Sequence, residues 1–380
     1  MRVWSNSVHG PNMTSDMSGP YLVISRHDFR TPRKANMHFI AECLAERGQT
    51  SFFSFGFSHL SRLKQDPRIS LWDLANKVEN VRGVQTYLWR TPLHPVSLRK
   101  SALRGLETAL FRAYIRLAPQ IFKDWIRRSN VILIESGFPV IFIRLCTELN
   151  PSAKLIYIAS DGLRTIDCAQ YIVDEFEATA GQLDGLRVPS PLLFDEIPNR
   201  EAAYFVPHGL DADVLEHDGP SPYPAGRHAV SVGSMLFDKG FFEIAARAFP
   251  DVTFHVIGAG SGAAALAAPN IRIYDEMKFQ DTIPYLRHAD FGVAPYNAGR
   301  VAPYLVDTSM KLMQYGYLGL PAVCPTVVAG DKLGRFGYSP GDAATITSAI
   351  RSALDFGRFK GPPALSWREV TDRILDPVNT

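Results

Sequence analysis

Short, continuous apolar runs recur along this chain and alternate with stretches of helical periodicity, and this alternation constrains the fold most. Two clear runs are Val131–Ser136 (VILIES) and Lys154–Ser160 (KLIYIAS), with a helical pattern between them at Phe138–Leu149. Strands that are apolar on both faces are typical of parallel sheets covered by helices on both sides. The sequence therefore predicts an α/β protein with doubly wound sheets.

The pattern occurs twice. The predicted strands are Tyr21–Ser25, Thr50–Phe55, Val84–Leu88, Val131–Ser136 and Lys154–Ser160, and then Ala229–Gly233, Val252–Ile257, Ile271–Tyr274, Phe291–Ala294 and Ala322–Cys324. The predicted helices are Ala35–Arg47, Phe138–Leu149, Gly240–Ala248, Asp281–His288, Asp307–Leu318, Asp342–Leu354 and Trp367–Leu375. We expect two tandem Rossmann-like domains that face a deep cleft, with ligands at the carboxyl ends of the strands.

The domain boundaries follow from composition. The expected segments are a flexible tail at 1–20, an α/β domain at 21–208, a Pro/Gly/Asp-rich linker at 209–228, a second α/β domain at 229–365, and a C-terminal helix and tail at 366–380 that can cross back to the first domain. The first 20 residues contain no apolar stretch typical of a secretory signal, and no apolar run is long enough for a spanning helix.

Charge is distributed unevenly. Residues 1–160 carry 22 Lys/Arg and 11 Asp/Glu, whereas residues 161–220 carry 3 and 13. The basic front half indicates an anionic partner, which on charge alone is a membrane surface, phosphate or nucleic acid.

With 46% hydrophobic and 21% charged residues the chain is not intrinsically disordered. Four scattered cysteines predict reduced thiols and a cytoplasmic protein.

The segment Asp307–Pro321 (DTSMKLMQYGYLGLP) is the most informative motif. Lys311 and Gln314 are three residues apart and share one helix face. The pattern is similar to the nucleotide-sugar segment of glycosyltransferases with the GT-B fold, in which a cation faces the diphosphate and a Glu holds the ribose. Gln314 stands where that Glu is usual. The alternative is a solvated Asp307–Lys311 ion pair.

Taken together, the motifs resemble one family, the membrane-associated inverting β-glucuronosyltransferases of xanthan-type exopolysaccharide assembly. The matching segments are HDFRTPR (27–33), ASDGL (159–163), HGLD (208–211), VGSMLFD (232–238), VTFHVIG (252–258), EMK (276–278) and the 307–325 segment. The resemblance implies that the first domain binds the acceptor and faces the membrane, and that the second binds the nucleotide sugar. It also implies transfer of glucuronate from UDP-glucuronate to a polyprenyl-diphosphate-linked oligosaccharide.

The resemblance assigns residues to the nucleotide sugar. They are Met235, Glu276, Met277, Tyr296, Ser309, Met310, Lys311 and Gln314. For Met235, Met277 and Tyr296 the alternative is core packing. The donor carboxylate needs a cation, for which Lys311, Arg300 and Lys239 remain open. No Asp-x-Asp pair follows a strand in the second domain, so we expect no metal and no cofactor.

Asp161 is the expected catalytic base. It follows the strand Lys154–Ser160 in an Asp-Gly turn, and the resemblance implies that it takes the proton of the acceptor hydroxyl. The alternative is that Asp-Gly is only a common turn. Rival groups also follow strands or begin the linker, with uncertain roles; they are His27, Asp28, Glu135 and Asp211.

A basic amphipathic stretch at Val96–Arg128 carries eight Lys/Arg and two acidic residues. Such stretches lie in membrane interfaces, and the alternative is a domain helix with a solvated basic face. Phe55 and Phe57 run into basic residues and are expected to form an apolar rim. We therefore expect peripheral attachment to the anionic inner face of the cell membrane.

Two other classes of function are compatible with parts of the sequence. Gly258–Ala263 (GAGSGA) follows a strand and partly fits the dinucleotide fingerprint of an oxidoreductase, but Pro269 leaves little room for the helix that must follow. A non-catalytic binder of nucleic acid or membrane is supported only by the basic front half, and no nucleic-acid motif is present, so we expect no nucleic-acid partner. A glycosyltransferase of the same fold that uses another UDP-sugar also remains open.

Overall fold

The structure is a computed structural model that describes residues 18–31, 34–63, 66–166, 168–217, 219–297, 299 and 301–377. Most of the expected tail at 1–20 and the candidate Arg300 lie outside the described residues. The chain divides into two compact units. Unit 1 runs to His208 and resumes at Trp367, and unit 2 runs from Gly209 to Ser366.

Unit 1 is built on an eight-stranded sheet with the order β3-β4-β2-β1-β5-β6-β7-β8. Its strands are β1 (Tyr21–Ser25), β2 (Thr50–Phe57), β3 (Val78–Val81), β4 (Val84–Arg90), β5 (Val131–Glu135), β6 (Lys154–Ile158), β7 (Gly185–Val188) and β8 (Ala203–Phe205). Only β3 runs antiparallel, against β4. In the central register Val23 pairs with Phe52 on one side and with Leu133 on the other.

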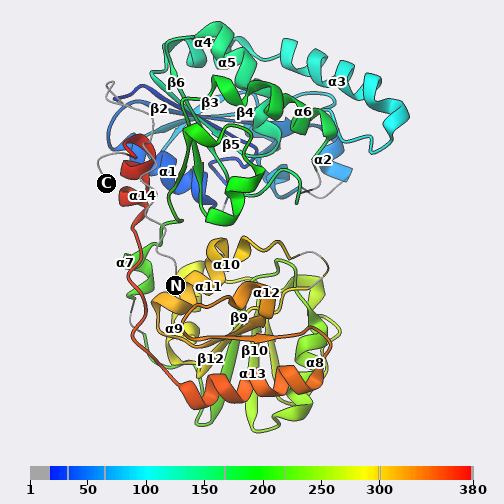
Figure 1. Cartoon of the computed structure of the whole chain (residues 1–380), viewed down its shortest axis with the longest axis vertical. Coiled ribbons are helices and arrows are strands. Elements are labelled where there is room, and N and C mark those ends of the chain that lie inside the picture. The colour runs from blue at the N-terminus through cyan, green and yellow to red at the C-terminus, as the bar shows by residue number, and fades with distance from the viewer. Residues whose placement is uncertain are drawn as a thin grey trace. The chain divides into compact units, whose positions relative to one another are not determined.

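Helices cover this sheet (Figure 1). They are α1 (Asn36–Ala45), α2 (His59–Leu63), α3 (Arg104–Arg116), α4 (Gln120–Arg128), α5 (Ile143–Leu149), α6 (Gln170–Thr179) and α14 (Trp367–Leu375). The C-terminal helix α14 packs on α1, where the rings of Phe39 and Trp367 stack at 5.0 Å. The Tyr204 hydroxyl donates to the Ile374 carbonyl at 2.8 Å.

The core of unit 1 is aromatic. Phe53 stacks on Phe122 of α4, with ring centroids 3.7 Å apart, and Phe52, Phe55 and Phe57 are also completely buried. Burial of each such side chain contributes about 1.5–3 kcal/mol. The expectation that Phe55 and Phe57 form an exposed apolar rim is therefore wrong, because both lie in the core.

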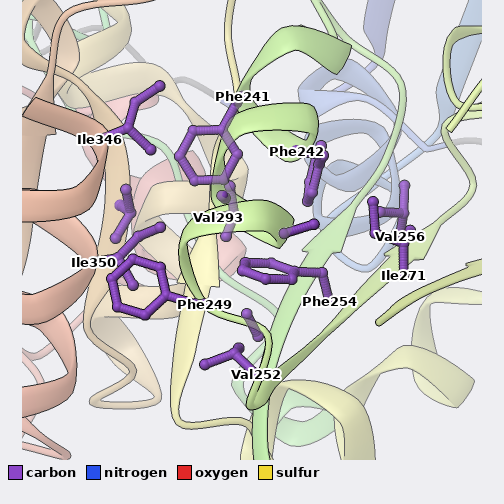
Figure 2. Packing of buried hydrophobic residues seen from close by; sticks show 14 of the residues in the cluster. Phe241, Phe242, Phe249, Val252, Phe254, Val256, Ile271, Val293, Ile346 and Ile350 are labelled. Atoms are coloured by element: carbon purple, nitrogen blue, oxygen red, sulfur yellow. The ribbon is translucent and has the colours of Figure 1, made fainter. Parts of the chain in front are cut away.

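Unit 2 is a six-stranded, wholly parallel sheet with the order β11-β10-β9-β12-β13-β14. Its strands are β9 (Arg227–Val232), β10 (Val252–Ile257), β11 (Ile271–Tyr274), β12 (Phe291–Val293), β13 (Ala322–Pro325) and β14 (Arg335–Tyr338). Its helices are α7 (Ala212–Leu215), α8 (Lys239–Ala248), α9 (Phe279–His288), α10 (Leu305–Thr308), α11 (Met310–Tyr317), α12 (Thr326–Ala329) and α13 (Ala343–Phe356). Figure 2 shows Phe241 and Phe242 packed with Phe254 and Ile350 in its core.

Two parallel-sheet units confirm the predicted α/β class, with local corrections. The helix expected at Asp307–Leu318 is two helices, because Ser309 ends α10 and caps α11. The linker expected at 209–228 contains α7, and β9 already begins at Arg227. The predicted helix at Phe138–Leu149 begins with a 3₁₀ segment, Phe138–Phe142. All four cysteines are free thiols, as predicted.

Candidate active site

The loops that follow β9, β10, β11 and β12 are joined at the carboxyl edge of the unit 2 sheet. The Asp238 amide donates to the Pro295 carbonyl, and the Asn297 amide donates to the Leu236 carbonyl, both at 2.7 Å. The Gly258 amide donates to the Tyr274 carbonyl at 3.0 Å. This edge is the part of a doubly wound sheet at which ligands bind.

The predicted nucleotide-sugar residues follow these strands. Met235 is 51% exposed in the loop after β9, so the alternative that it packs in the core is wrong. Glu276 is exposed and Met277 partly exposed after β11. Gly258, whose φ is +68°, packs against the backbone of Glu276, because a β-carbon at Gly258 would lie 3.5 Å from the Glu276 Cα. Tyr296 after β12 is completely buried.

Ser309 fixes the start of α11. Its Oγ accepts from the Leu312 amide at 3.2 Å and shares a 2.6 Å hydrogen bond with the Tyr296 hydroxyl. The N-terminus of α11 is thereby held to the loop after β12. Met310, Lys311 and Gln314 of α11 are each partly exposed.

The ammonium of Lys311 is buried although the residue as a whole is partly exposed, and it has no hydrogen-bond partner among the described residues. Its Nζ lies 5.5 Å from the centroid of the Tyr296 ring. Burial lowers the pKa of Lys311 to about 7. Asp307, the partner in the alternative interpretation, instead forms an ion pair with Lys332 at 2.8 Å. An anion brought to this point would compensate the buried charge.

Asp161 lies just beyond β6, at the carboxyl edge of the unit 1 sheet. Its amide and that of Ser160 donate to the Ser136 Oγ, at 3.3 and 3.0 Å. The loop is therefore tied to the end of the neighbouring strand β5, and Asp161 is partly exposed.

Glu196 is a neighbour of Asp161 that the sequence did not reveal. A β-carbon at Gly162 would overlap the Glu196 carboxylate, so the absence of a side chain lets Glu196 approach this closely. The φ angle of Gly162 is not positive, so a left-handed backbone is not the reason for glycine here. Burial raises the pKa of Glu196, and its Oε2 has no hydrogen-bond partner among the described residues. The carboxylate borders a cavity of about 200 Å³, and a smaller one that Asp161 also lines.

Glu135 is fully engaged within unit 1. It is 5% exposed, and its carboxylate accepts from the Ser25 Oγ at 2.5 Å and from the Ser160 Oγ at 3.3 Å. It links the ends of β1, β5 and β6 and positions the residue before Asp161. His27, by contrast, is exposed, and its amide donates to the Ser25 Oγ.

Asp28 is a structural ion-pair residue. It is completely buried and makes a two-point contact with Arg30, at 2.8 and 3.0 Å, while the Ser54 Oγ donates to it at 2.6 Å. Burial alone would raise the pKa of Asp28, but the hydrogen bonds and charge of Arg30 outweigh it and hold that pKa below its ordinary value. Asp28 is thus unsuited to take a proton.

Three other candidates have local explanations. Asp211 caps α7 by accepting from the Val214 amide at 3.4 Å. The glycine-rich Gly258–Ala263 contains only the three-residue 3₁₀ turn Gly260–Gly262, and the next element is the strand β11, so the segment lacks the phosphate-facing helix of a dinucleotide site. Lys239 lies 3.6 Å from Glu243 and is exposed. Within the described ranges, no three His, Cys, Asp or Glu side chains are grouped as metal ligands would be.

Comparison with known proteins decides the family. The family model described as "Glucuronosyltransferase GumK, N-terminal domain" matches residues 23–189. The UDP-glucuronate:glycolipid 2-β-glucuronosyltransferase of Xanthomonas campestris pv. campestris is 51% identical over 357 residues, which cover 94% of this chain and 89% of that protein. The chain belongs to this glucuronosyltransferase family. The resemblance inferred from the sequence motifs and the predicted enzyme class, a glycosyltransferase, are confirmed.

Solved structures agree on the glucuronosyltransferase's fold. Sucrose-phosphate synthase from Thermosynechococcus elongatus has a TM-score of 0.57 at 13% identity, with 94% of both chains covered. Anabaena HepE, solved with UDP and glucose, has a TM-score of 0.53 at 14% identity, covering 94% of this chain and 98% of that one. At such identities the likeness concerns the fold alone, and it confirms the GT-B architecture.

Proposed function

We propose that this glucuronosyltransferase transfers glucuronate from UDP-glucuronate to a lipid-linked oligosaccharide, with inversion and without a metal ion. The observation that carries the proposal is the buried, unpartnered ammonium of Lys311 beside Tyr296 and Ser309. The family relative is named for the same donor and for a glycolipid acceptor.

The donor diphosphate meets Lys311 in this proposal. A diphosphate oxygen that contacts Nζ supplies the counter-charge that the described chain does not, and the N-terminus of α11 adds a favourable dipole. Met235, exposed in the neighbouring loop, offers an apolar surface to the base or ribose. Gln314, one turn on, can accept from one ribose hydroxyl and donate to the other.

Asp161 acts as the base. The acceptor hydroxyl oxygen attacks the anomeric carbon, the bond from that carbon to the diphosphate oxygen breaks, and UDP departs with the electron pair. The hydroxyl proton passes to the Asp161 carboxylate. Attack opposite the leaving group inverts the anomeric centre. Of the three acids that directly follow or end strands β1, β5 and β6, Asp161 has the exposure that this role needs, whereas Asp28 and Glu135 are buried and saturated.

Charge on the departing UDP is balanced by Lys311 and by the amides at the start of α11, without a metal. Activity that survives a strong chelator agrees with it, and activity restored only by added Mg²⁺ or Mn²⁺ contradicts it.

A leucine ridge on α3 supports attachment to the inner membrane surface. We use this name for Leu103, Leu106, Leu110 and Leu117, which are 37–70% exposed at helical spacing. Arg104, Arg112 and Arg116 are also exposed on this helix. An apolar stripe flanked by cations suits the interface of an anionic membrane. No helix in the described ranges is long and apolar enough to cross a bilayer.

The test is a radiolabelled transfer assay with a polyprenyl-diphosphate oligosaccharide and a panel of UDP-, GDP- and TDP-sugars, alongside thermal stabilisation by each nucleotide. The expected result is stabilisation by UDP and transfer from UDP-glucuronate alone. Transfer only from another UDP-sugar overturns the donor assignment. Stabilisation by NADH without UDP binding overturns the whole proposal.

A further inference from the structure

Unit 1 carries a cluster of three arginines and one histidine at the ends of three neighbouring strands. Arg26 directly follows β1, His59 and Arg62 belong to α2 after β2, and Arg90 ends β4. The strands β4, β2 and β1 are adjacent and parallel, so their carboxyl ends lie along one edge. We call these four residues the cationic rim.

Trp72 holds the outer part of the rim. The guanidinium carbons of Arg62 and Arg90 lie 4.1 and 4.5 Å from the centre of its ring, and the His59 ring lies 5.1 Å away. Arg90 also donates to the Trp72 carbonyl at 2.8 Å. Stacking on an aromatic ring orients a guanidinium but leaves its full charge.

Arg26 is exposed at the inner end of the rim. Its Nε lies 3.8 Å from the position that a Gly56 β-carbon would take. Its carbonyl accepts from Arg68, which also donates to the Phe55 and Gly56 carbonyls. The Arg68 side chain thus ties the backbone at the inner end to the end of β2.

The rim arginines differ from their neighbours in charge compensation. Arg30 is paired with Asp28, and Arg68 is paired through two atoms with Asp66. In the part of the chain that the structure describes, no carboxylate forms an ion pair with Arg62 or Arg90, whereas Asp66, the partner of Arg68, also interacts electrostatically with Arg26. Two stacked arginines that keep open hydrogen-bond donors fit a phosphate or diphosphate, which guanidinium groups bind through paired oxygens.

The rim's position suggests which phosphate it meets. In the order β4-β2-β1-β5-β6, Arg26 lies two strand spacings from β6, whose loop carries Asp161. At about 4.8 Å per spacing this is roughly 10 Å, the scale of a short glycan. At its inner end the rim also adjoins α3, because the Gly56 amide donates to the Tyr114 hydroxyl at 3.1 Å. Tyr114 lies on the helix that carries the leucine ridge.

We propose that the cationic rim binds the diphosphate of the lipid-linked acceptor. The lipid then extends toward the leucine ridge and the glycan extends toward Asp161. This inference rests on the proposed function, because it takes the acceptor to be a diphosphate-linked lipid. Anionic phospholipid headgroups share the phosphate chemistry, so the experiment must separate the two sources.

The experiment compares the double variant Arg62→Gln/Arg90→Gln with the wild type on two acceptors in detergent, the polyprenyl-diphosphate glycan and the same glycan on a neutral alkyl chain. We expect KM for the diphosphate acceptor to rise about ten- to a hundredfold, as for the loss of charged hydrogen bonds. KM for the alkyl glycoside and for UDP-glucuronate should not change. Arg62→Lys/Arg90→Lys should restore part of the effect.

The matched control is Arg144→Gln, which removes an exposed arginine of the same unit that is paired with Glu175. An equal rise of KM on both acceptors, or no rise on either, overturns the inference.

Flotation with neutral phosphatidylcholine vesicles containing either a polyprenyl diphosphate or phosphatidylglycerol gives the second readout. The Arg62→Gln/Arg90→Gln variant is expected to lose binding only to the vesicles that contain the polyprenyl diphosphate. Equal loss of binding to both kinds of vesicle overturns the inference. If the wild type transfers to neither acceptor, the proposed function fails instead.

Discussion

The buried carboxylates of Asp28 and Glu135 in unit 1 and the buried ammonium of Lys311 in unit 2 differ in where their compensation comes from. In unit 1 the buried carboxylates of Asp28 and Glu135 have their partners within the protein, from Arg30, Ser54, Ser25 and Ser160. In unit 2 the buried ammonium of Lys311 has no hydrogen-bond partner in the described chain. The difference teaches that burial alone does not mark a ligand site. A buried charge marks one when its compensation has to come from outside.

The sharpest test on the unit 1 side is Asp161→Asn. The amide cannot take the acceptor proton, so kcat should fall by about 10²–10⁴, while UDP binding measured by calorimetry should not change. Asp174→Asn, an exposed acid of the same unit, is the control. Turnover retained by the Asp161 variant would remove this residue from the mechanism.

Asp28→Asn should act on stability instead. The substitution removes one of the two carboxylates paired with the Arg30 guanidinium, and Glu79 remains. The loss of the charged hydrogen bonds to Asp28 costs about 1.5–3 kcal/mol of unfolding free energy. Urea denaturation measures the loss. A variant that unfolds at the same urea concentration as the wild type but loses turnover would make Asp28 a site residue, and the contrast drawn above would be wrong.

Lys311→Met should have effects of opposite sign on stability and binding. Removing an uncompensated buried cation should raise Tm, because no partner is lost. UDP affinity should fall about ten- to a hundredfold. Scanning calorimetry and UDP titration measure the two effects, with the exposed Lys239→Met as control. A fall in Tm together with unchanged UDP affinity would identify Lys311 as a structural residue.

The smallest expected effect is that of Gly162→Ala. The added methyl group displaces the Glu196 carboxylate and shifts the Asp161 loop slightly, so kcat should fall about tenfold, less than the loss expected for a displacement of 1 Å. Gly181→Ala, at a glycine of unit 1 with open space around its Cα, should leave kcat unchanged. If the two variants had equal kcat, the position of the Glu196 carboxylate would not affect catalysis through the Asp161 loop.

The sequence predicted the strands whose apolar character is continuous, such as β5 and β6. It did not predict β7 (GLRV) or β14 (RFGY), which are four residues long and carry an arginine. Arg187 of β7 is completely buried and donates to the Pro207 carbonyl at 2.7 Å. A charged residue in so short a run cancels the hydrophobic signal, and its partner lies 20 residues away.

The candidate site was predictable where strand ends could be located. Asp161, Met235 and Tyr296 follow predicted strands, and their placement at sheet edges follows from that alone. The proximity of Glu196 to Gly162 depends on how two distant segments fold together, and no local pattern encodes it. The sequence also could not predict that the Lys311 ammonium is buried, because lysine on an amphipathic helix usually reaches solvent.

The central claim is that the Lys311 ammonium receives its counter-charge from the donor diphosphate, and proton uptake tests it most directly. Burial lowers the folded-state pKa of Lys311 to about 7, well below its value in the unfolded chain. The unfolded chain therefore binds more protons in the range between the two pKa values, and this group makes the ligand-free protein more stable as pH rises through that range.

At about pH 8 the free protein holds Lys311 mostly neutral, so UDP binding should recharge it and take up a proton. Calorimetric titration with UDP in two buffers of different protonation enthalpy measures this uptake. The account predicts an uptake approaching one proton per UDP in the wild type and none in Lys311→Met. No uptake in the wild type, or equal uptake in both proteins, would contradict it.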